Sequence, residues 1–493
     1  MKFLYKYICL GLLMGGLGAC ESNFEEINTN PNKPDKIAPE FILSDVLVRT
    51  AYLYQSDSYM GKLASVNRYI TLTRNEADDL FHWTGNSWSG QYEILANNKN
   101  LYDLSSELEM KHCQAISLII KSFLFSYTSD LFGDIPYSKA LLSKEENIIY
   151  PSYDTQEEVY QGVLSDLKTA NELLSSEGFI DEEMDVIYQG DAMKWRKFAN
   201  SLRLRLLLRV SNKLNDAFAK IQEIANDPST YPIFESNEDN ANLEYLGLIT
   251  DNMWPGGENR LEVWDFEKRR PSQVLIRHLL ERNDPRMKVW FNPVKADPAS
   301  GISDQNEYVG VPHAIPAPYE YNGGGDNQSL LADIYRKNNH PMVQAMMMNY
   351  TEVLFILAET VQKGNVTVSG ETAESLYYKA IGASMEQYEV MQEAEDQAYN
   401  DQELVKYDNS LEQLITQKWL ALWLTGGEAW FNFRRTGFPV FPIGPRAVQK
   451  VIPSRMIYPT EEAATNEVNY EQAIVQQGWA EDGINEKIWY LQD

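Results

Sequence analysis

Apolar residues recur every three to four positions over long tracts of the chain from Glu40 onward, which is the period of an α-helix with one buried face. The recurrence groups into about four helix-turn-helix pairs, the unit of tetratricopeptide-like arrays. We place these pairs at 87–131, 154–211, 345–389 and 407–435, with turns near 108, 177–190, 363–370 and 425–427. The predicted fold class is therefore mostly α, with a tetratricopeptide-like scaffold of helical pairs.

Residues at the predicted helix ends suit their positions. Asp154 and Thr155 stand where an N-cap is expected, because their side-chain oxygens accept hydrogen bonds from free amides of the first turn. Gly133 and Gly437 follow predicted helices and tolerate the positive φ that ends a helix. These residues support the boundaries that the hydrophobic period gives.

The second helix of the pair 154–211 carries basic residues beside its apolar stripe. The stripe consists of Trp195, Phe198, Ala199, Leu202 and Leu206. Arg203, Arg205 and Arg209 project away from that stripe. In so acidic a chain we expect all three to pair with carboxylates.

The helical period is largely lost between residues 227 and 340, apart from about 270–282. Proline, glycine and aromatic residues crowd together there, as in Trp254-Pro255-Gly256-Gly257. Long loop regions in compact proteins are usually functional or disordered, and the aromatic content argues against disorder. We predict an irregular, loop-rich second lobe over about 227–340.

The first residues form a secretory signal. Lys2 and Lys6 precede a short apolar run, which ends in Leu17-Gly18-Ala19-Cys20. That ending resembles the lipobox of bacterial lipoproteins, in which the cysteine becomes the acylated first residue. We therefore expect a lipoprotein signal peptide at 1–19, a lipidated tether at 20–39 and a folded body at 40–493.

The net charge of the chain limits the classes of partner that it can bind. The formal net charge is −28 at pH 7, so the surface repels phosphate backbones and nucleic acid is excluded as a partner. Attachment to a membrane then depends on acyl chains rather than on basic side chains. With Cys9 in the signal and Cys20 lipidated, Cys113 stands alone, and we expect it to be buried.

No catalytic motif is recognisable. The five histidines are scattered, and neither a G-x-S-x-G elbow nor a phosphate-binding glycine loop is present. We therefore expect no enzyme, no metal and no cofactor. A structural calcium ion at the oxygens of Glu238, Asp239 and Asn240 remains an alternative, although the spacing fits no EF-hand.

Aromatic residues in loops are the candidate ligand-binding residues. Sugar rings stack their C–H faces on tryptophan or tyrosine while polar groups bind the hydroxyls. The candidates are Trp83, Asn86 and Trp88 in one loop, with Trp254, Trp264, Tyr319 and Tyr321 in the second lobe. We expect the first group to face the second across a ligand site, although packing within the lobe is the competing interpretation of every loop aromatic.

Several segments resemble the SusD/RagB family in order along nearly the whole chain. The segments are Phe24–Asn32 (FEEINTNPN), Asp130–Tyr137 (DLFGDIPY), Tyr188–Asp191, Asn283–Arg286, Asn349–Glu352 and Gln417–Trp419. The resemblance implies a helical fold with four tetratricopeptide-like pairs packed against a more variable lobe. It also implies an outer-membrane lipoprotein, facing the cell exterior, that passes a nutrient to a SusC-like TonB-dependent porter.

The ligand that this resemblance implies is a glycan, most simply an oligosaccharide. Some RagB-like relatives handle peptides, so a peptide ligand is the first alternative. A surface glycoside hydrolase on a helical scaffold is the second, and it requires two facing carboxylates about 5–10 Å apart. A structural lid that closes the porter without touching substrate is the third.

Overall fold

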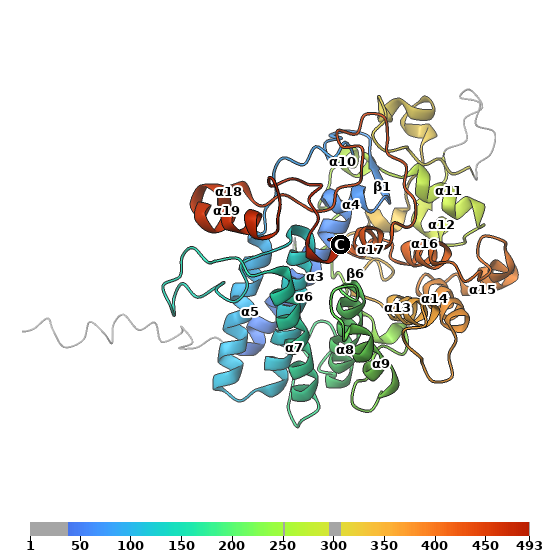
Figure 1. Ribbon diagram of the computed structural model, residues 1–493. Helices are drawn as coiled ribbons and strands as arrows, with labels where there is room; N and C mark the ends of the chain where they lie inside the picture. The colour runs from blue at the N-terminus through green and yellow to red at the C-terminus, as the bar shows by residue number, and fades with distance from the viewer. Residues whose placement is uncertain (1–37, 250–251, 295–306, 493) are drawn as a thin grey trace, which may run out of the picture.

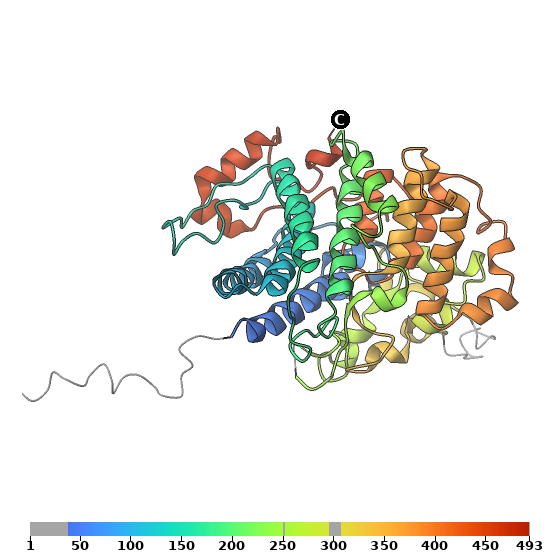
Figure 2. The same ribbon diagram turned by 90° about the horizontal axis from the view of Figure 1, so that it is seen from below.

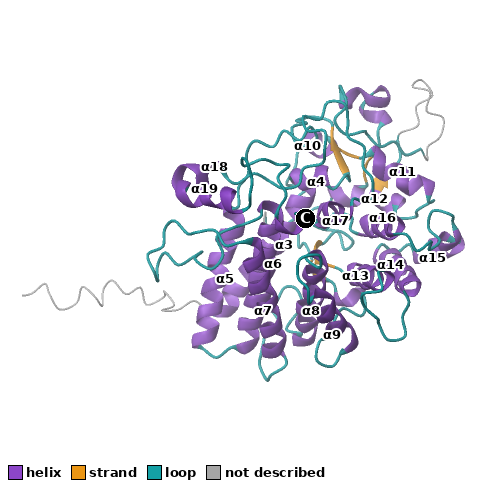
Figure 3. Ribbon diagram, in the orientation of Figure 1, coloured by secondary structure: helices purple, strands orange, loops and turns teal. Residues whose placement is uncertain are grey.

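Long helices dominate the protein and strands are few and short (Figure 3), as the hydrophobic period predicts. The computed structural model describes residues 38–249, 252–294 and 307–492. The predicted signal peptide, Cys20 and all but the end of the predicted tether lie outside the described residues.

Four helical pairs form the scaffold, which confirms the predicted fold class. They are α5 (Ser89–Glu107) with α6 (Lys111–Phe132), α7 (Gln156–Leu174) with α8 (Ala192–Arg209), α13 (Tyr350–Gln362) with α14 (Ala373–Gln387), and α16 (Leu411–Ala421) with α17 (Glu428–Thr436). Figures 1 and 2 follow the array from α5 and α6 in blue to cyan, through α7 and α8 in green, to α13 and α14 in orange. Each helix buries an apolar face against its neighbours.

The helix ends follow the local chemistry. Thr155 caps α7 in a capping box with Glu158, whereas Asp154 accepts hydrogen bonds from the amides of the 137–138 turn. Gly437 ends α17 in the left-handed conformation. Gly133 ends α6 with a φ of 94°, and a side chain there would collide with Gln477. The positive φ therefore favours glycine at position 133, and the close approach of Gln477 adds to that preference.

The third pair begins later than predicted. Residues 345–348 form strand β6 (Ala345–Met348), and Asn349 caps α13 by accepting a hydrogen bond from the amide of Glu352. The run of methionines before the helix fits either state by periodicity alone. The segment forms a strand because it pairs with β2 (Ala241–Leu243).

Short elements fill the rest of the chain. Before and between the pairs lie α3 (Pro39–Met60), α4 (Lys62–Val66), β1 (Ile70–Leu72) and α9 (Ala217–Asn226). The lobe at 227–340 holds β2, α10 (Val263–Glu267), β3 (Arg269–Pro271), α11 (Gln273–Glu281), α12 (Met287–Trp290), β4 (Phe291–Asn292) and β5 (Leu330–Leu331). Toward the C-terminus lie α15 (Met391–Asp396), α18 (Thr460–Thr465) and α19 (Glu467–Gln476).

Two of the two-stranded sheets attach the lobe to the rest of the protein. β1 pairs antiparallel with β3, and β6 pairs antiparallel with β2, while β4 and β5 pair within the lobe. The first pairing places Leu72 opposite Arg269 and so joins the chain after β1 to α10. The lobe is thus packed against the helical scaffold at two separate points.

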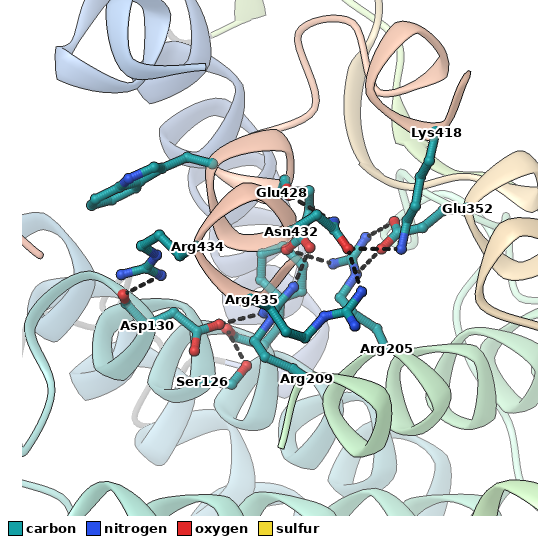
Figure 4. A network of polar contacts seen from close by, with 12 residues as sticks. Ser126, Asp130, Arg205, Arg209, Glu352, Lys418, Glu428, Asn432, Arg434 and Arg435 are labelled. Atoms are coloured by element: carbon teal, nitrogen blue, oxygen red, sulfur yellow. Dashed lines mark hydrogen bonds and ion pairs between the residues drawn. The ribbon is translucent and has the colours of Figure 1, made fainter. Parts of the chain in front are cut away.

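A buried ionic network joins α6, α8, α13 and α17 at the centre of the scaffold (Figure 4). Arg205 forms a bidentate pair with Glu352, at 2.9 and 2.5 Å, and its guanidinium lies 3.7 Å from Glu428. Arg209 pairs with both Asp130 and Glu428. The expected pairing with carboxylates is therefore present for Arg205 and Arg209. Arg203 differs: it stacks on Tyr231, with 5.2 Å from its guanidinium carbon to the ring centre.

Helix α6 is long and apolar enough, by length and composition, to cross a membrane. Its side chains are almost all buried inside the protein, so we assign it as a core helix of the scaffold. Cys113 lies on this helix and is buried, as predicted, and burial raises the pKa of its thiol to about 12. The thiol is therefore inert at neutral pH.

Candidate ligand-binding site

Trp83 lies in the core rather than on a ligand face. Its side chain is 4% exposed, and its ring centre lies 5.9 Å from that of Trp430 in an edge-on contact. The indole Nε1 donates a hydrogen bond to the carbonyl oxygen of Asp78 at 3.2 Å. Both the apolar body and the polar tip of Trp83 are satisfied inside the protein.

Trp88 and Asn86 are likewise engaged within the fold. Trp88 is 7% exposed, and its ring packs against Phe132 at 5.2 Å and Tyr458 at 5.8 Å between centres. Asn86 donates from Nδ2 to the carbonyl oxygen of Ile457 at 2.9 Å. The two tryptophan rings of the loop at 82–88 are therefore buried and Asn86 bonds to the C-terminal segment, so the expectation of an exposed platform at Trp83, Asn86 and Trp88 is corrected.

Trp254 is also buried. It is fully enclosed, with its ring 4.8 Å from Tyr59 and 5.9 Å from Tyr335 between centres. Its Nε1 donates to the carbonyl oxygen of Tyr335 at 2.9 Å. Trp254 contributes to the wall of a small cavity, which is described below, and not to an open surface.

Three of the predicted aromatics remain at the surface, and we call them, together with Arg74, the ligand face. Trp264 on α10 is 53% exposed and Tyr319 is 43% exposed, while Tyr321 is half-buried. The exposed Arg74 guanidinium lies 4.4 Å above the ring centre of Tyr319. In Figure 1, α10 and β1 lie at the opposite end of the molecule from α7 and α9.

Backbone contacts connect the two halves of the ligand face. The amide of Thr73 donates to the carbonyl oxygen of Lys268 at 2.8 Å, which extends the β1–β3 pairing toward Arg74. On the other side, Lys268 folds back so that its ammonium lies 5.6 Å from the ring centre of Trp264. A continuous path therefore runs from Trp264 through Lys268 and Thr73 to Arg74 and Tyr319.

The tyrosine turn of the ligand face is held rigidly from beneath. Buried Gln328 donates from Nε2 to the carbonyl oxygens of Pro318, Tyr319 and Tyr321, at 2.9, 3.2 and 2.8 Å. The hydroxyl of Tyr321 accepts a hydrogen bond from Gln273 at 3.0 Å. The rings are thus presented in fixed positions before any ligand arrives, which limits the entropy lost on binding.

Basic groups lie close to the aromatics of the ligand face, together with the carboxylates of Asp265, Glu267 and Asp326. Burial lowers the pKa of Arg270, which lies beneath the tyrosine turn and donates to the carbonyl oxygen of Gln328 at 3.3 Å. Burial opposes the charge on Asp265, but Lys268 and Arg269 together hold its pKa below its usual range. Asp265 therefore stays ionised and fixes two of the cations near Trp264.

This arrangement can bind a ligand that has apolar faces and polar edges. Exposed tryptophan and tyrosine rings stack on C–H surfaces, and guanidinium and carboxamide groups donate hydrogen bonds to hydroxyl or carbonyl oxygens. Sequence reasoning missed Arg74, Lys268 and Gln273. The positive charge of Arg74 and Lys268 in an acidic chain was a signal that these residues could bind a ligand. Residues 74 and 319 are too far apart in the sequence for their contact to be predicted from it.

The part of the chain that the structure describes contains no group of three His, Cys, Asp or Glu side chains placed to hold a metal ion. In the loop considered for calcium, Asp239 Oδ2 accepts from Lys197 at 2.9 Å and from the amide of Glu235 at 2.8 Å. Asn240 Oδ1 accepts from the amide of Tyr350 at 2.7 Å. Protein donors thus engage these oxygens.

Comparison with known proteins identifies clear relatives. The SusD-like family model described as "Starch-binding associating with outer membrane" matches residues 31–459. Two SusD homologues from Bacteroides fragilis are 27% and 26% identical, with TM-scores of 0.79 and 0.80, and the alignments cover 93% and 92% of this chain and 100% of each homologue. A chitin-binding SusD homologue from Flavobacterium johnsoniae is 22% identical, with a TM-score of 0.74, over 92% of this chain and 97% of that one. No curated protein matches the chain.

Proposed function

Because this chain belongs to the SusD-like family of starch-binding proteins that associate with the outer membrane, we propose that it captures an oligosaccharide at the cell surface and delivers it to a SusC-like TonB-dependent porter. The observation that carries the proposal is the ligand face, where Arg74 lies over the exposed ring of Tyr319 and the exposed Trp264 is connected to Arg74 through Lys268 and the amide of Thr73. The name of the chitin-binding homologue also supports a glycan ligand. The role is one of binding, with no catalytic step.

The expected affinity follows from the number of exposed rings. Ring stacking contributes about 1 kcal/mol per contact beyond area burial. Two or three such contacts, together with hydrogen bonds from Arg74 and Gln273, give dissociation constants in roughly the micromolar to millimolar range. Such binding suits a receptor that must release its ligand to a porter.

Replacing Trp264 or Tyr319 with alanine is expected to weaken oligosaccharide binding about tenfold, because each change removes one stacking surface. Both side chains lie at the surface and are about half exposed, so the thermal midpoint should stay within about 2 °C of the wild type. Isothermal titration with malto- and chito-oligosaccharides measures the affinity. Phe179, which is 65% exposed and lies outside the ligand face, provides the matched aromatic control.

An unchanged affinity in Trp264→Ala and Tyr319→Ala, for a glycan that the wild type binds, would exclude the ligand face. Binding of peptides but of no glycan would favour the peptide alternative. Binding by neither class, combined with an intact complex with the porter, would favour the structural lid.

Attachment to the outer membrane is proposed to depend on acylation of Cys20, with the body facing the cell exterior. Since the short apolar run before Cys20 cannot span a bilayer, which requires about 20 apolar residues, acyl chains would supply the anchor. Cys20→Ala should abolish labelling by a radioactive fatty acid and release the protein from the membrane fraction. Cys113→Ala is the control cysteine change, and retention of the Cys20→Ala protein in membranes would refute the anchor.

A further inference from the structure

A cavity whose lining includes none of the ligand-face residues lies where α3, β2, β6 and α14 meet. Its volume is about 230 Å³, below the range of about 300–1,000 Å³ that is typical for drug-sized ligands, so it suits a molecule of about one ring. Six carboxamide side chains line it, namely those of Gln55, Asn237, Asn240, Asn242, Gln344 and Gln387. No charged side chain belongs to the lining within the described ranges 38–249, 252–294 and 307–492.

Hydrogen bonds inside the protein fix the orientation of Asn240. Its Oδ1 accepts from the amide of Tyr350 at 2.7 Å, which leaves Nδ2 as the outward donor. Asn240 is only 6% exposed and belongs to the lining of the cavity. An acceptor inside the cavity can therefore take a hydrogen bond from its Nδ2 group.

Gln387, on α14, offers an acceptor oxygen that the protein does not use. Its side chain is half-buried, and its Oε1 is buried without a hydrogen-bond partner among the described residues. Asn237 is tied to the scaffold through Nδ2, which donates to the carbonyl oxygen of Ala383 and to Glu386, both at 2.9 Å, but its Oδ1 is likewise buried without a partner among the described residues. The cavity therefore combines amides that bond within the protein, such as the paired Asn242 and Gln344, with two buried amide oxygens that lack a partner among the described residues.

Aromatic rings complete the wall. The cavity is lined by four rings, those of Trp254, Tyr335, Tyr388 and Trp423. The indole Nε1 of Trp254 donates to the carbonyl oxygen of Tyr335, and the indole Nε1 of Trp423 donates to the hydroxyl oxygen of Tyr335. Since those donors are used internally, the two tryptophans offer only carbon surface. Two carboxylates, Glu244 and Glu386, accept hydrogen bonds from lining amides and are not themselves part of the lining.

From this combination we propose that the cavity is a second binding site, for a single uncharged, hydroxyl-rich ring. A hydroxyl both donates and accepts, and so does a carboxamide, so the two match without any formal charge. A charged ligand would find no counter-ion in the lining, and the loss of its hydration would oppose binding. The ring is either a free monosaccharide or the terminal unit of a longer glycan, because both present the same chemistry.

Saturation-transfer NMR on the full processed protein in detergent tests the proposal, with glucose and N-acetylglucosamine as neutral probes and glucuronate as the charged probe. We expect saturation of a neutral probe and none of glucuronate. Gln387→Met keeps the size of the side chain and removes its amide, so affinity for the bound probe should fall about three- to tenfold without loss of stability. Gln362→Met changes a half-buried glutamine at the end of α13, outside the lining, and should leave binding unchanged.

Two results overturn the proposal. If neither neutral probe receives saturation, the cavity holds water alone; if Gln387→Met binds a probe as the wild type does, the probe lies elsewhere. When a neutral probe does bind, displacement by maltotetraose or chitotetraose assigns the site to a chain end, and persistence assigns it to a free ring. Titrations of Trp264→Ala test the ligand face separately, so the two proposals can fail independently.

Discussion

Replacing Glu428 with glutamine should lower the free energy of unfolding by about 3–5 kcal/mol, the range for breaking a buried ion pair from one side. Glu428 is 2% exposed and is shared between two arginines, since it pairs with Arg209 and lies 3.7 Å from Arg205 (Figure 4). It also accepts a hydrogen bond from the hydroxyl of Tyr54 at 3.3 Å. Loss of its charge leaves two buried guanidinium groups to share the remaining carboxylates, Asp130 and Glu352.

Denaturant unfolding measured by circular dichroism gives this difference, and an exposed pair provides the control. Lys99 pairs with Asp103 at 2.6 Å on the surface of α5, where solvent screens the charges. Asp103→Asn should therefore change stability by less than about 1 kcal/mol. Equal effects of the two substitutions would show that the network in Figure 4 contributes no more than a surface pair.

The loss of stability caused by Glu428→Gln should also become smaller as the pH falls. Burial opposes the charge of Glu428, but Arg205 and Arg209 hold its pKa below its usual range. The unfolded pKa of glutamate is about 4.3, so this stabilisation is fully present above about pH 4.3 and is lost as pH falls through the lower folded pKa. The stability difference between wild type and Glu428→Gln should therefore shrink on acidification.

The helical scaffold was predictable because its signals are local. The apolar period and the N-cap at Thr155 lie within a few residues of the helices that they define. Strand β6 was mistaken for the start of a helix because its partner, β2, lies about a hundred residues earlier in the chain. The short helices α18 and α19, which bury few apolar residues, gave no period strong enough to single them out.

The candidate site was predictable only in part, since local sequence does not decide whether an aromatic residue in a loop is buried. Trp83 and Trp264 both stand in short stretches of mixed polar and apolar residues in the sequence. The difference between them arises from distant segments: Trp430 covers Trp83, and Ile457 anchors the neighbouring Asn86, whereas Trp264 remains 53% exposed. The contact between Arg74 and Tyr319 depends in the same way on the pairing of β1 with β3.

Trp83→Ala should therefore have the opposite effect to Trp264→Ala. Truncating a buried tryptophan removes its packing and leaves a cavity, which costs about 3–5 kcal/mol of unfolding free energy. The hydrogen bond from Nε1 to the carbonyl oxygen of Asp78 is lost as well. Because Trp83 packs on Trp430 and Phe81, and the ligand face stands on α10 and the tyrosine turn, the folded fraction should bind oligosaccharide with unchanged affinity.

Denaturant unfolding and titration of the same preparation separate the two roles of tryptophan. We expect Trp83→Ala to lose stability and keep its affinity, and Trp264→Ala to keep its stability and lose its affinity. Trp83→Phe, which restores most of the ring volume, should recover more than half of the lost stability, because packing contributes more than the single hydrogen bond. A Trp83→Ala protein that is as stable as the wild type but binds about tenfold more weakly would show that Trp83 contacts the ligand. That result would contradict the burial of Trp83 in the structure.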